Sequence, residues 1–363
     1  MKIINQLFLF ALLALVLASC KNYSEQQESQ TTGIDTLQVI DFTTVVSTES
    51  ALLGEPREIV SIDDKHIAVY DHSDKKIIMF NGDGDELDEF GNVGEGPGEW
   101  DSMSGAADLN FVSDRFFTNN QGRYLFDLYD RSGNHIRSMT YPQYLNYSHK
   151  TLLPDNKLLV VTNGRENALA TLLDLNEEGK IIQKIGLPES EYSESRNYEQ
   201  ERVTYSNGKI PENDLNEALA VKGKDGYFLF MNALGELRYY SDEGELIMHI
   251  NIPENIKRSR FDYVIRKNRE LYGNLVLPLR YAQDIKIHDD LIYLFMPKPD
   301  RSATELDFRI LVYNLNGELQ KHYVFVDSNS EYFFYDFAMS SDKNIYLMDI
   351  MKSEISKFSP VIE

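Results

Sequence analysis

The stretch REIVSIDDKHIAVYDHSDKKIIMFNGDGDELDEF, residues 57–90, contains four short apolar segments separated by tight polar turns. Apolar and polar residues alternate within the segments, for example around Ile77 and Met79, and this alternation is typical of half-buried strands. Residues 81–84, Asn-Gly-Asp-Gly, are the types that a tight hairpin turn requires. The stretch therefore predicts one unit of four antiparallel strands.

The third strand of this unit and its turn return along the chain. The turn glycines stand at positions 84, 133, 179, 244 and 317, and a shorter sixth copy, NIYLMDIMKSEISKF, covers residues 344–358. The first two spacings, 49 and 46 residues, suit a four-stranded propeller blade. The two longer spacings, 65 and 73 residues, predict insertions, which we place near residues 188–214 and 252–274.

Repeated units of this length predict an all-β fold, a six-bladed β-propeller of four-stranded antiparallel blades, because radial repetition leaves few open strand edges. The sixth copy lacks an outer strand. The segment TLQVIDFTTVV, Thr36–Val46, precedes the first blade and alternates like a strand. We expect this N-terminal segment to pair with the last blade and to close the ring, so that residues 36–363 form the propeller.

The N-terminus has the features of a secreted lipoprotein. Lys2 precedes an apolar run, Leu7–Ala18, which is too short to span a bilayer and suits a signal peptide over residues 1–19. LASC, Leu17–Cys20, resembles the bacterial lipobox, in which the cysteine becomes lipidated; an ordinary signal peptide is the alternative. Residues 20–35 then form a lipidated cysteine and a flexible tether. Cys20 is the only cysteine, so no disulfide is predicted.

The charge balance limits the partners. The chain carries 36 basic and 58 acidic residues, a formal net charge of −22. A nucleic acid would be repelled over most of such a surface, so nucleic-acid binding is not predicted. The hydrophobic content of 42% is sufficient for a packed core.

A glycine-rich loop, FGNVGEGPGEW, follows the first unit. It is not a phosphate cradle, because no helix and no Lys-Ser/Thr pair follow it and Pro97 removes a backbone donor. We interpret it as a structural connector between blades, in which Trp100 is buried and Glu99 accepts backbone N–H groups. The alternative is that Glu99 and Trp100 contact a ligand. The connector comprises Gly94, Gly96, Pro97, Gly98, Glu99 and Trp100.

The connector pattern G-x-x-G-x-G-P-G-E-W resembles the blade-to-blade loops of NHL-type propellers, and residues 54–71 are similar to their inner and second strands. Together with the lipobox, the chain resembles the six-bladed NHL- and TolB-like propeller lipoproteins of Bacteroidetes. The resemblance implies an extracytoplasmic protein anchored by lipid to a bacterial membrane, on the periplasmic side of the outer membrane or exposed at the cell surface.

No linear motif predicts catalysis or a cofactor. The seven histidines lack metal-binding spacing, and no nucleophile motif is present. The acidic turns 71–76 and 81–89 leave calcium as an alternative, but neither has the full calcium-binding loop, so turn chemistry is the interpretation adopted.

The second insertion carries a basic patch on an acidic protein. Phe261, Ile265 and Tyr272 recur at helical spacing, which predicts a short helix packed on the ring. Its charged side chains are either a solvated face or a site for an anionic group, with arginine forks and flat tyrosine rings. The candidate ligand-binding residues are Arg258, Arg260, Tyr263, Arg266, Arg269 and Tyr272.

These observations favour a binding or scaffold propeller that recognises a protein partner or a glycan at the mouth of its central channel. The alternative is a propeller enzyme, a lyase or lactonase-like hydrolase, at the same place. Such enzymes gather Glu, Asp, Asn or His from separate blades, which no linear motif reveals.

Overall fold

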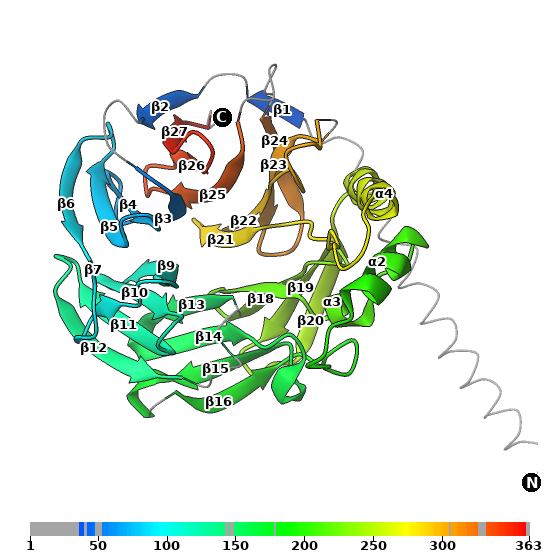
Figure 1. Ribbon diagram of the computed structural model, residues 1–363, viewed down its shortest axis with the longest axis horizontal. Helices are drawn as coiled ribbons and strands as arrows, with labels where there is room; N and C mark the ends of the chain where they lie inside the picture. The colour runs from blue at the N-terminus through cyan, green and yellow to red at the C-terminus, as the bar shows by residue number, and fades with distance from the viewer. Residues whose placement is uncertain are drawn as a thin grey trace, which may run out of the picture. The chain divides into compact units, whose positions relative to one another are not determined.

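The computed structural model describes residues 36–39, 42–47, 53–141, 145, 149–177, 179–304, 306–325 and 332–360 of the chain (Figure 1). The predicted signal peptide, Cys20 and the tether lie outside these residues. The segment from Thr36 to the C-terminus forms one compact unit, and the description below concerns this unit alone.

Within the described residues the strands form six antiparallel blades around a central channel, which confirms the predicted six-bladed propeller (Figure 1). Each blade runs from an inner strand at the channel to an outer strand at the rim. In each of the first five blades, four strands follow one another along the chain. The first two of these blades are β3–β6 (Pro56–Ser61, His66–Asp71, Lys76–Asn81, Glu86–Phe90) and β9–β12 (Ala106–Val112, Arg115–Asn120, Leu125–Asp130, His135–Thr140), and the next three are β13–β16 (Lys150–Leu153, Lys157–Val161, Ala170–Asp174, Lys180–Ile185), β17–β20 (Ala218–Lys222, Gly226–Met231, Glu236–Ser241, Leu246–Asn251) and β21–β24 (Asp284–His288, Leu291–Met296, Phe308–Asn314, Leu319–Phe325). The sixth blade has three such strands, β25–β27 (Phe334–Met339, Ile345–Asp349, Glu354–Phe358).

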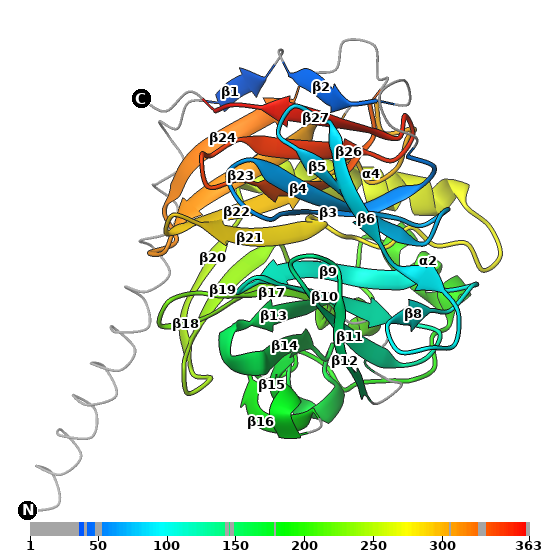
Figure 2. The ribbon, with the colours of Figure 1, turned by 90° about the vertical axis from the view of Figure 1, so that its left-hand side faces the viewer.

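The N-terminal segment closes the ring, as expected. β2 (Thr43–Val46) pairs antiparallel with β27 and becomes the outer strand of the sixth blade. β1 (Thr36–Val39) instead pairs parallel with β24 and adds a fifth strand to the fifth blade. The two strands therefore lie along the rim of neighbouring blades (Figure 2).

The turns from which the repeat was identified share one hydrogen-bond pattern. A polar residue ends the third strand, and its side-chain oxygen accepts the backbone N–H groups two and four residues later. Asn81 accepts them from Asp83 at 3.0 Å and from Asp85 at 2.9 Å. A glycine with positive φ, Gly84 in this turn, occupies the position between them. The same pattern recurs at Asp130, Ser241 and Asn314.

Apolar side chains fill the space between neighbouring blades. One cluster joins the first and second blades and contains Tyr70, Trp100, Phe116 and Tyr129. Similar clusters join the third blade to the fourth and the fifth blade to the sixth. The core thus lies between the blade faces, and both polar and apolar residues of the inner strands border the channel.

Both insertions are helical. The first contains α2 (Tyr198–Ser206) and the short α3 (Glu212–Leu215), and the second contains α4 (Glu254–Glu270). α2 and α4 lie side by side at the rim (Figure 1), where Arg269 Nε donates to the carbonyl oxygen of Ser206 at 2.9 Å. In the described residues no helix is both long and apolar enough to cross a membrane.

The predicted helix is confirmed, but its predicted buried face is wrong. The side chains that α4 buries are Ile256, Arg260, Tyr263, Val264 and Asn268. Phe261 and Ile265 lie beside this face and are only partly buried. Tyr272 follows the helix and is 79% exposed. Arg260 and Asn268 can lie in the buried stripe because their side chains donate to backbone carbonyls, Arg260 to that of Tyr281 and Asn268 to those of Val264 and Leu277. Two polar residues in this stripe made it hard to recognise in the sequence.

Candidate functional site

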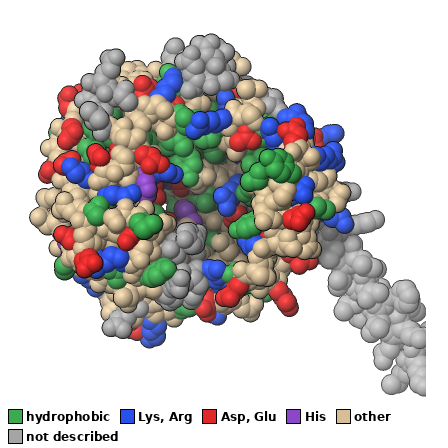
Figure 3. Space-filling model, viewed as in Figure 1, with side chains coloured by type: hydrophobic (Ala, Val, Ile, Leu, Met, Phe, Trp, Pro, Cys, Tyr) green, Lys and Arg blue, Asp and Glu red, His purple; other side chains and the backbone are tan. Residues whose placement is uncertain are grey.

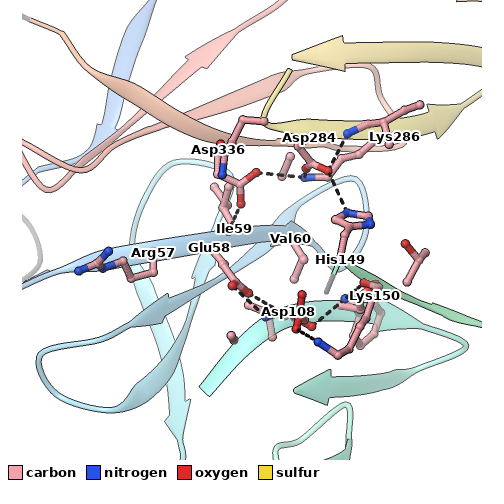
Figure 4. A pocket seen from close by; sticks show the side chains of 18 of the residues that line it. Arg57, Glu58, Ile59, Val60, Asp108, His149, Lys150, Asp284, Lys286 and Asp336 are labelled. Carbon is pink, nitrogen blue, oxygen red and sulfur yellow. Dashed lines mark hydrogen bonds and ion pairs between the residues drawn. The ribbon is translucent and has the colours of Figure 1, made fainter. Parts of the chain in front are cut away.

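The central channel contains a cavity of about 650 Å³ lined by the inner strands of the blades. The space-filling view shows the hollow in the middle of one face, with histidine side chains at its edge (Figure 3). Consecutive residues of the inner strands border this cavity, among them residues 57–61, 106–112 and 283–288. The charged residues gathered there are Glu58, Asp108, Lys150, Asp284, Lys286 and Asp336, together with His149 (Figure 4).

Two of these carboxylates hold neighbouring blades together. Glu58, on β3, accepts hydrogen bonds from the backbone N–H of Asp108, at 2.8 Å, and from that of Leu109, both on β9. Asp336, on β25, accepts one from the backbone N–H of Ile59 at 2.9 Å. Each side chain is fixed by an adjacent blade, so the cavity wall is rigid.

The two lysines of the cavity are paired with carboxylates. Lys150 Nζ lies 3.0 Å from Asp108 Oδ2. Lys286 Nζ lies 2.8 Å from Asp284 Oδ2 and 3.6 Å from Asp336 Oδ1. His149 Nε2 lies 3.8 Å from the other oxygen of Asp284. Glu58 is the carboxylate of this group that has no ion-pair partner among the described residues.

The environments of these carboxylates shift their pKa values in opposite directions. Burial raises the pKa of Glu58 to about 8, and the nearby Asp108 adds to the rise. Burial also raises the pKa of Asp336 to about 6, against the effect of Lys286. Burial alone would raise the pKa of Asp284, but Lys286 and His149 outweigh it and hold that pKa well below its usual range. Groups perturbed in this way cluster at functional sites.

A second cavity, of about 600 Å³, lies at the mouth of the channel beside the first insertion. It shares Glu58, Asp108 and His149 with the first cavity, so the two are continuous. Its wall is rich in arginine, tyrosine and amide side chains, namely Asn163, Arg165, Tyr192, Arg196, Tyr198, Asn213, Asn216 and Arg280.

Most charges of this mouth are also compensated. Arg196 Nη2 lies 2.8 Å from Glu201 and 2.6 Å from Asp214, and Arg280 pairs with Glu217. The guanidinium carbon of Arg165 lies 4.5 Å from the centre of the Tyr192 ring. The insertion therefore forms an ordered wall at the mouth of the channel.

The glycine-rich connector has the geometry expected of a structural loop. Trp100 is fully buried, and its ring packs edge-on against Tyr70 and Tyr129 at centroid distances of 5.5 and 6.2 Å. Glu99 accepts a hydrogen bond from the backbone N–H of Gly96 at 2.5 Å. The loop closes on itself through a short parallel pair, β7 (Asn92–Val93) with β8 (Glu99–Trp100). Gly94, Pro97, Glu99 and Trp100 line neither cavity.

The basic patch of the second insertion is divided between two environments. Arg260 and Tyr263 are buried, and Tyr263 donates to Asp300 at 2.7 Å. Arg258 is exposed and lies 3.8 Å from Asp262, while Arg266 lies over the Tyr263 ring at 5.2 Å. None of these residues, nor Arg269 or Tyr272, lines either cavity. The structure does not bring the six together as one site.

The acidic turns use their side chains within the turns. Asp71 is fully buried and accepts hydrogen bonds from the backbone N–H groups of Gly54, at 2.6 Å, and Ser73, at 2.8 Å. This is the arrangement that turn chemistry predicts. Across the described residues, no three His, Cys, Asp or Glu side chains are grouped so that they could hold a metal ion.

The sequence interpretation missed the channel residues. A signal for them exists: the strands PREIVS, AADLNFV, DIKIH and FYDFAM each contain one or two charged residues beside apolar ones. The sequence of one blade does not show which side chains of the next blade will lie beside its own. The grouping therefore became visible only once the ring was closed.

Comparison with known proteins supports the fold. A family model described as 6-bladed beta-propeller (DUF5128) matches residues 19–107. No curated protein matches the sequence.

Solved structures of similar fold cover most of the chain at low sequence identity. A Bacteroides fragilis protein named as an exported one is 10% identical, with a TM-score of 0.55, over 90% of this chain and 95% of that chain. A protein of unknown function from Bacteroides thetaiotaomicron is 10% identical, with a TM-score of 0.52, over 88% of this chain and 75% of that one. A catalytically inactive virginiamycin B lyase from Staphylococcus aureus, with quinupristin, is 12% identical, with a TM-score of 0.50, over 88% of this chain and 99% of that chain.

Proposed function

We propose that the chain is a lipid-anchored, extracytoplasmic binding propeller that takes a segment of a partner protein or a glycan into the mouth of its central channel. The observation that carries this proposal is the pair of continuous cavities, of about 650 and 600 Å³. These volumes lie in the range of natural ligand pockets, and polar groups converge on them from separate blades.

The fixed wall of the cavity favours binding. Glu58 and Asp336 are held by backbone N–H groups of the next blade, so a ligand would meet side chains that are already in place. Preorganisation reduces the entropy that binding costs. The first insertion adds Tyr192 and Tyr198 to the mouth, and tyrosine is a common contact residue at recognition surfaces.

The proposed location rests on the N-terminal sequence. The apolar run Leu7–Ala18 and the lipobox-like Leu17–Cys20 support export and lipidation. Lipidation at Cys20 would keep the propeller at a bacterial membrane, on the periplasmic side of the outer membrane or at the cell surface.

Thermal unfolding of the full chain against a panel of peptides and glycans tests the binding proposal. A ligand that binds the native state raises Tm by an amount that grows with its concentration relative to Kd. The proposal expects at least one class to do so. A panel in which no peptide and no glycan shifts Tm at millimolar concentration would contradict it.

A second candidate function is that of a lyase or lactonase-like hydrolase at the same channel mouth. It is favoured by the opposite pKa shifts of Glu58 and Asp284, since paired acids and bases of enzymes are separated in this way. A propeller of similar fold is a lyase in Staphylococcus aureus. Incubation with lactones and acidic glycans, followed by chromatography, tests this alternative: cleavage that Glu58→Gln abolishes supports it, and intact substrates oppose it.

A further inference from the structure

The inference rests on the proposed function, because it names the chemical group that the same channel recognises. We propose that the channel binds the primary amino group of a peptide, and that the carboxylate of Glu58 supplies its counter-charge. Three features of the channel support this: the charge balance of the cavity, the unused acceptor capacity of Glu58 and the polar groups of the mouth.

The channel holds more carboxyl groups than lysines: Glu58, Asp108, Asp284 and Asp336 face Lys150 and Lys286. Lys150 is paired with Asp108, and Lys286 is paired with Asp284 and Asp336. At the mouth, Arg280 is paired with Glu217, and Arg196 with Glu201 and Asp214. Arg57 points away from the other labelled side chains (Figure 4) and pairs with Glu55. Glu58 is therefore the carboxyl group of the channel that has no cationic side chain at ion-pair distance among the described residues.

The acceptor capacity of Glu58 suits an ammonium group. Its carboxylate offers about four lone-pair sites, and two backbone N–H groups occupy two of them. An ammonium group brings three N–H donors and one positive charge, so it would use the remaining capacity and balance the buried charge. Tyr335 lines the same cavity, and an aromatic face attracts cations.

The mouth suits a peptide as the carrier of this group. Asn163, Asn213 and Asn216 line it, and amide side chains match the donors and acceptors of a peptide backbone. Asn163 Oδ1 is buried and has no hydrogen-bond partner in the part of the chain that the structure describes, so it can accept an N–H group. The exposed rim residues Glu191 and Glu194 would attract a cationic segment to the opening.

The pH dependence of binding separates two kinds of amine. Asp108, from β9, and Asp336, from β25, face Glu58, while Lys150 and Lys286 neutralise them in part. Because the pKa of Glu58 is raised to about 8, affinity for an ammonium group should increase as pH rises toward 8. A lysine side chain, with a pKa of about 10.4, stays charged there, whereas an α-amino group, with a pKa of about 8, loses its charge.

Titration calorimetry with three C-terminally amidated peptides tests the inference: Ac-Gly-Lys-Gly-NH2, the same peptide acetylated on the lysine side chain, and Gly-Gly-Gly-NH2 with a free amino terminus. We expect at least one of the two peptides with a free amine to bind. We also expect acetylation of the lysine side chain to weaken binding of the lysine peptide about tenfold or more. A lysine ligand should bind more tightly at pH 8 than at pH 6.5, and preference for the free amino terminus would identify that source instead.

Variants of the full chain complete the experiment. Glu58→Gln removes the charge and keeps one of the two oxygens that accept the backbone N–H groups. We expect it to weaken amine binding about tenfold and to remove the pH dependence. Glu86→Gln removes the same charge from the exposed outer strand of the same blade and should change nothing. Equal affinity for acetylated and free lysine, no binding of either free amine at millimolar concentration, or an unaffected Glu58→Gln would overturn the inference. If only uncharged peptides or glycans bind in the channel, the proposed function holds and the inference about the amino group fails.

Discussion

The carboxylate of Glu58 accepts a 2.8 Å hydrogen bond from the backbone N–H of Asp108, and this bond joins the inner strand of the first blade to that of the second. Asp336 makes the equivalent bond from the sixth blade to Ile59 of the first. The side chains that face the cavity are thus the ones that fasten the blades around it. Changes at these residues should affect both the stability of the ring and the chemistry of the channel.

The first prediction concerns the pH dependence of stability. Because the pKa of Glu58 is raised from 4.5 to about 8 in the folded protein, its contribution to stability is present below pH 4.5 and is lost as pH rises toward 8. Glu58→Gln cannot titrate, so the free energy of unfolding of the variant should fall less between pH 5 and pH 8 than that of wild type. A pKa that differs by one between the folded and unfolded states changes the free energy of unfolding by about 1.4 kcal/mol.

Urea unfolding at pH 5 and at pH 8 measures the effect, with Glu86→Gln as the control on the outer strand. Parallel stability profiles for wild type and Glu58→Gln would mean that the Glu58 carboxyl group titrates normally and is not confined by the cavity.

The second prediction concerns ring closure. Val46 is fully buried where β2 pairs with β27. Val46→Asp places a charge in that core and should lower the free energy of unfolding by about 3 kcal/mol or more. Thr44→Asp, at an exposed position of the same strand, should change it by less than about 0.5 kcal/mol. Similar unfolding midpoints for the two variants would contradict closure by β2.

The third prediction concerns the connector. Trp100→Ala should cost about 3–5 kcal/mol in ligand-free protein, because the indole fills the space between the first two blades. Met103→Ala, at a side chain that is 86% exposed, is the control and should leave the urea midpoint unchanged. If Trp100→Ala unfolds at the wild-type midpoint and instead loses a ligand, the connector is a binding loop.

The fourth prediction concerns the anchor. Cys20→Ala removes the thiol that lipidation requires, so the variant should leave the membrane fraction or retain its signal peptide. Fractionation and intact-mass measurement on the expressed protein check this. A variant that stays with membranes and differs from wild type only by the mass of the substitution would show that Cys20 carries no lipid.

The blades were predictable because their signals are local. The turn around Asn81 and Gly84 is specified by its own side chains, and five such turns together with the shorter sixth copy give the number of blades. The ring closure by Thr43–Val46 followed from a missing strand in the last copy. Trp100 was predicted to be buried as part of the connector between blades, and it is fully buried.

The channel was not predictable in the same way. Glu58, Asp108 and Asp336 come from strands far apart in the sequence, and each alone resembles a polar residue on the exposed side of a strand. The face of α4 was also mistaken, because Arg260 and Asn268 bury polar groups that bond to backbone carbonyls, that of Tyr281 in the case of Arg260. Tertiary hydrogen bonding decided both cases, and a one-dimensional pattern does not record it.

The decisive measurement for the channel uses a single residue that lines both cavities. Ala107, on β9, borders the channel and the mouth, so Ala107→Trp would fill the passage between them. Met103→Trp adds the same indole at an exposed position and is the control. For the first ligand that raises Tm in the panel, we expect the Kd to increase at least about tenfold in Ala107→Trp and to stay at the wild-type value in Met103→Trp. A folded Ala107→Trp protein that binds with the wild-type Kd would place the binding site outside the channel.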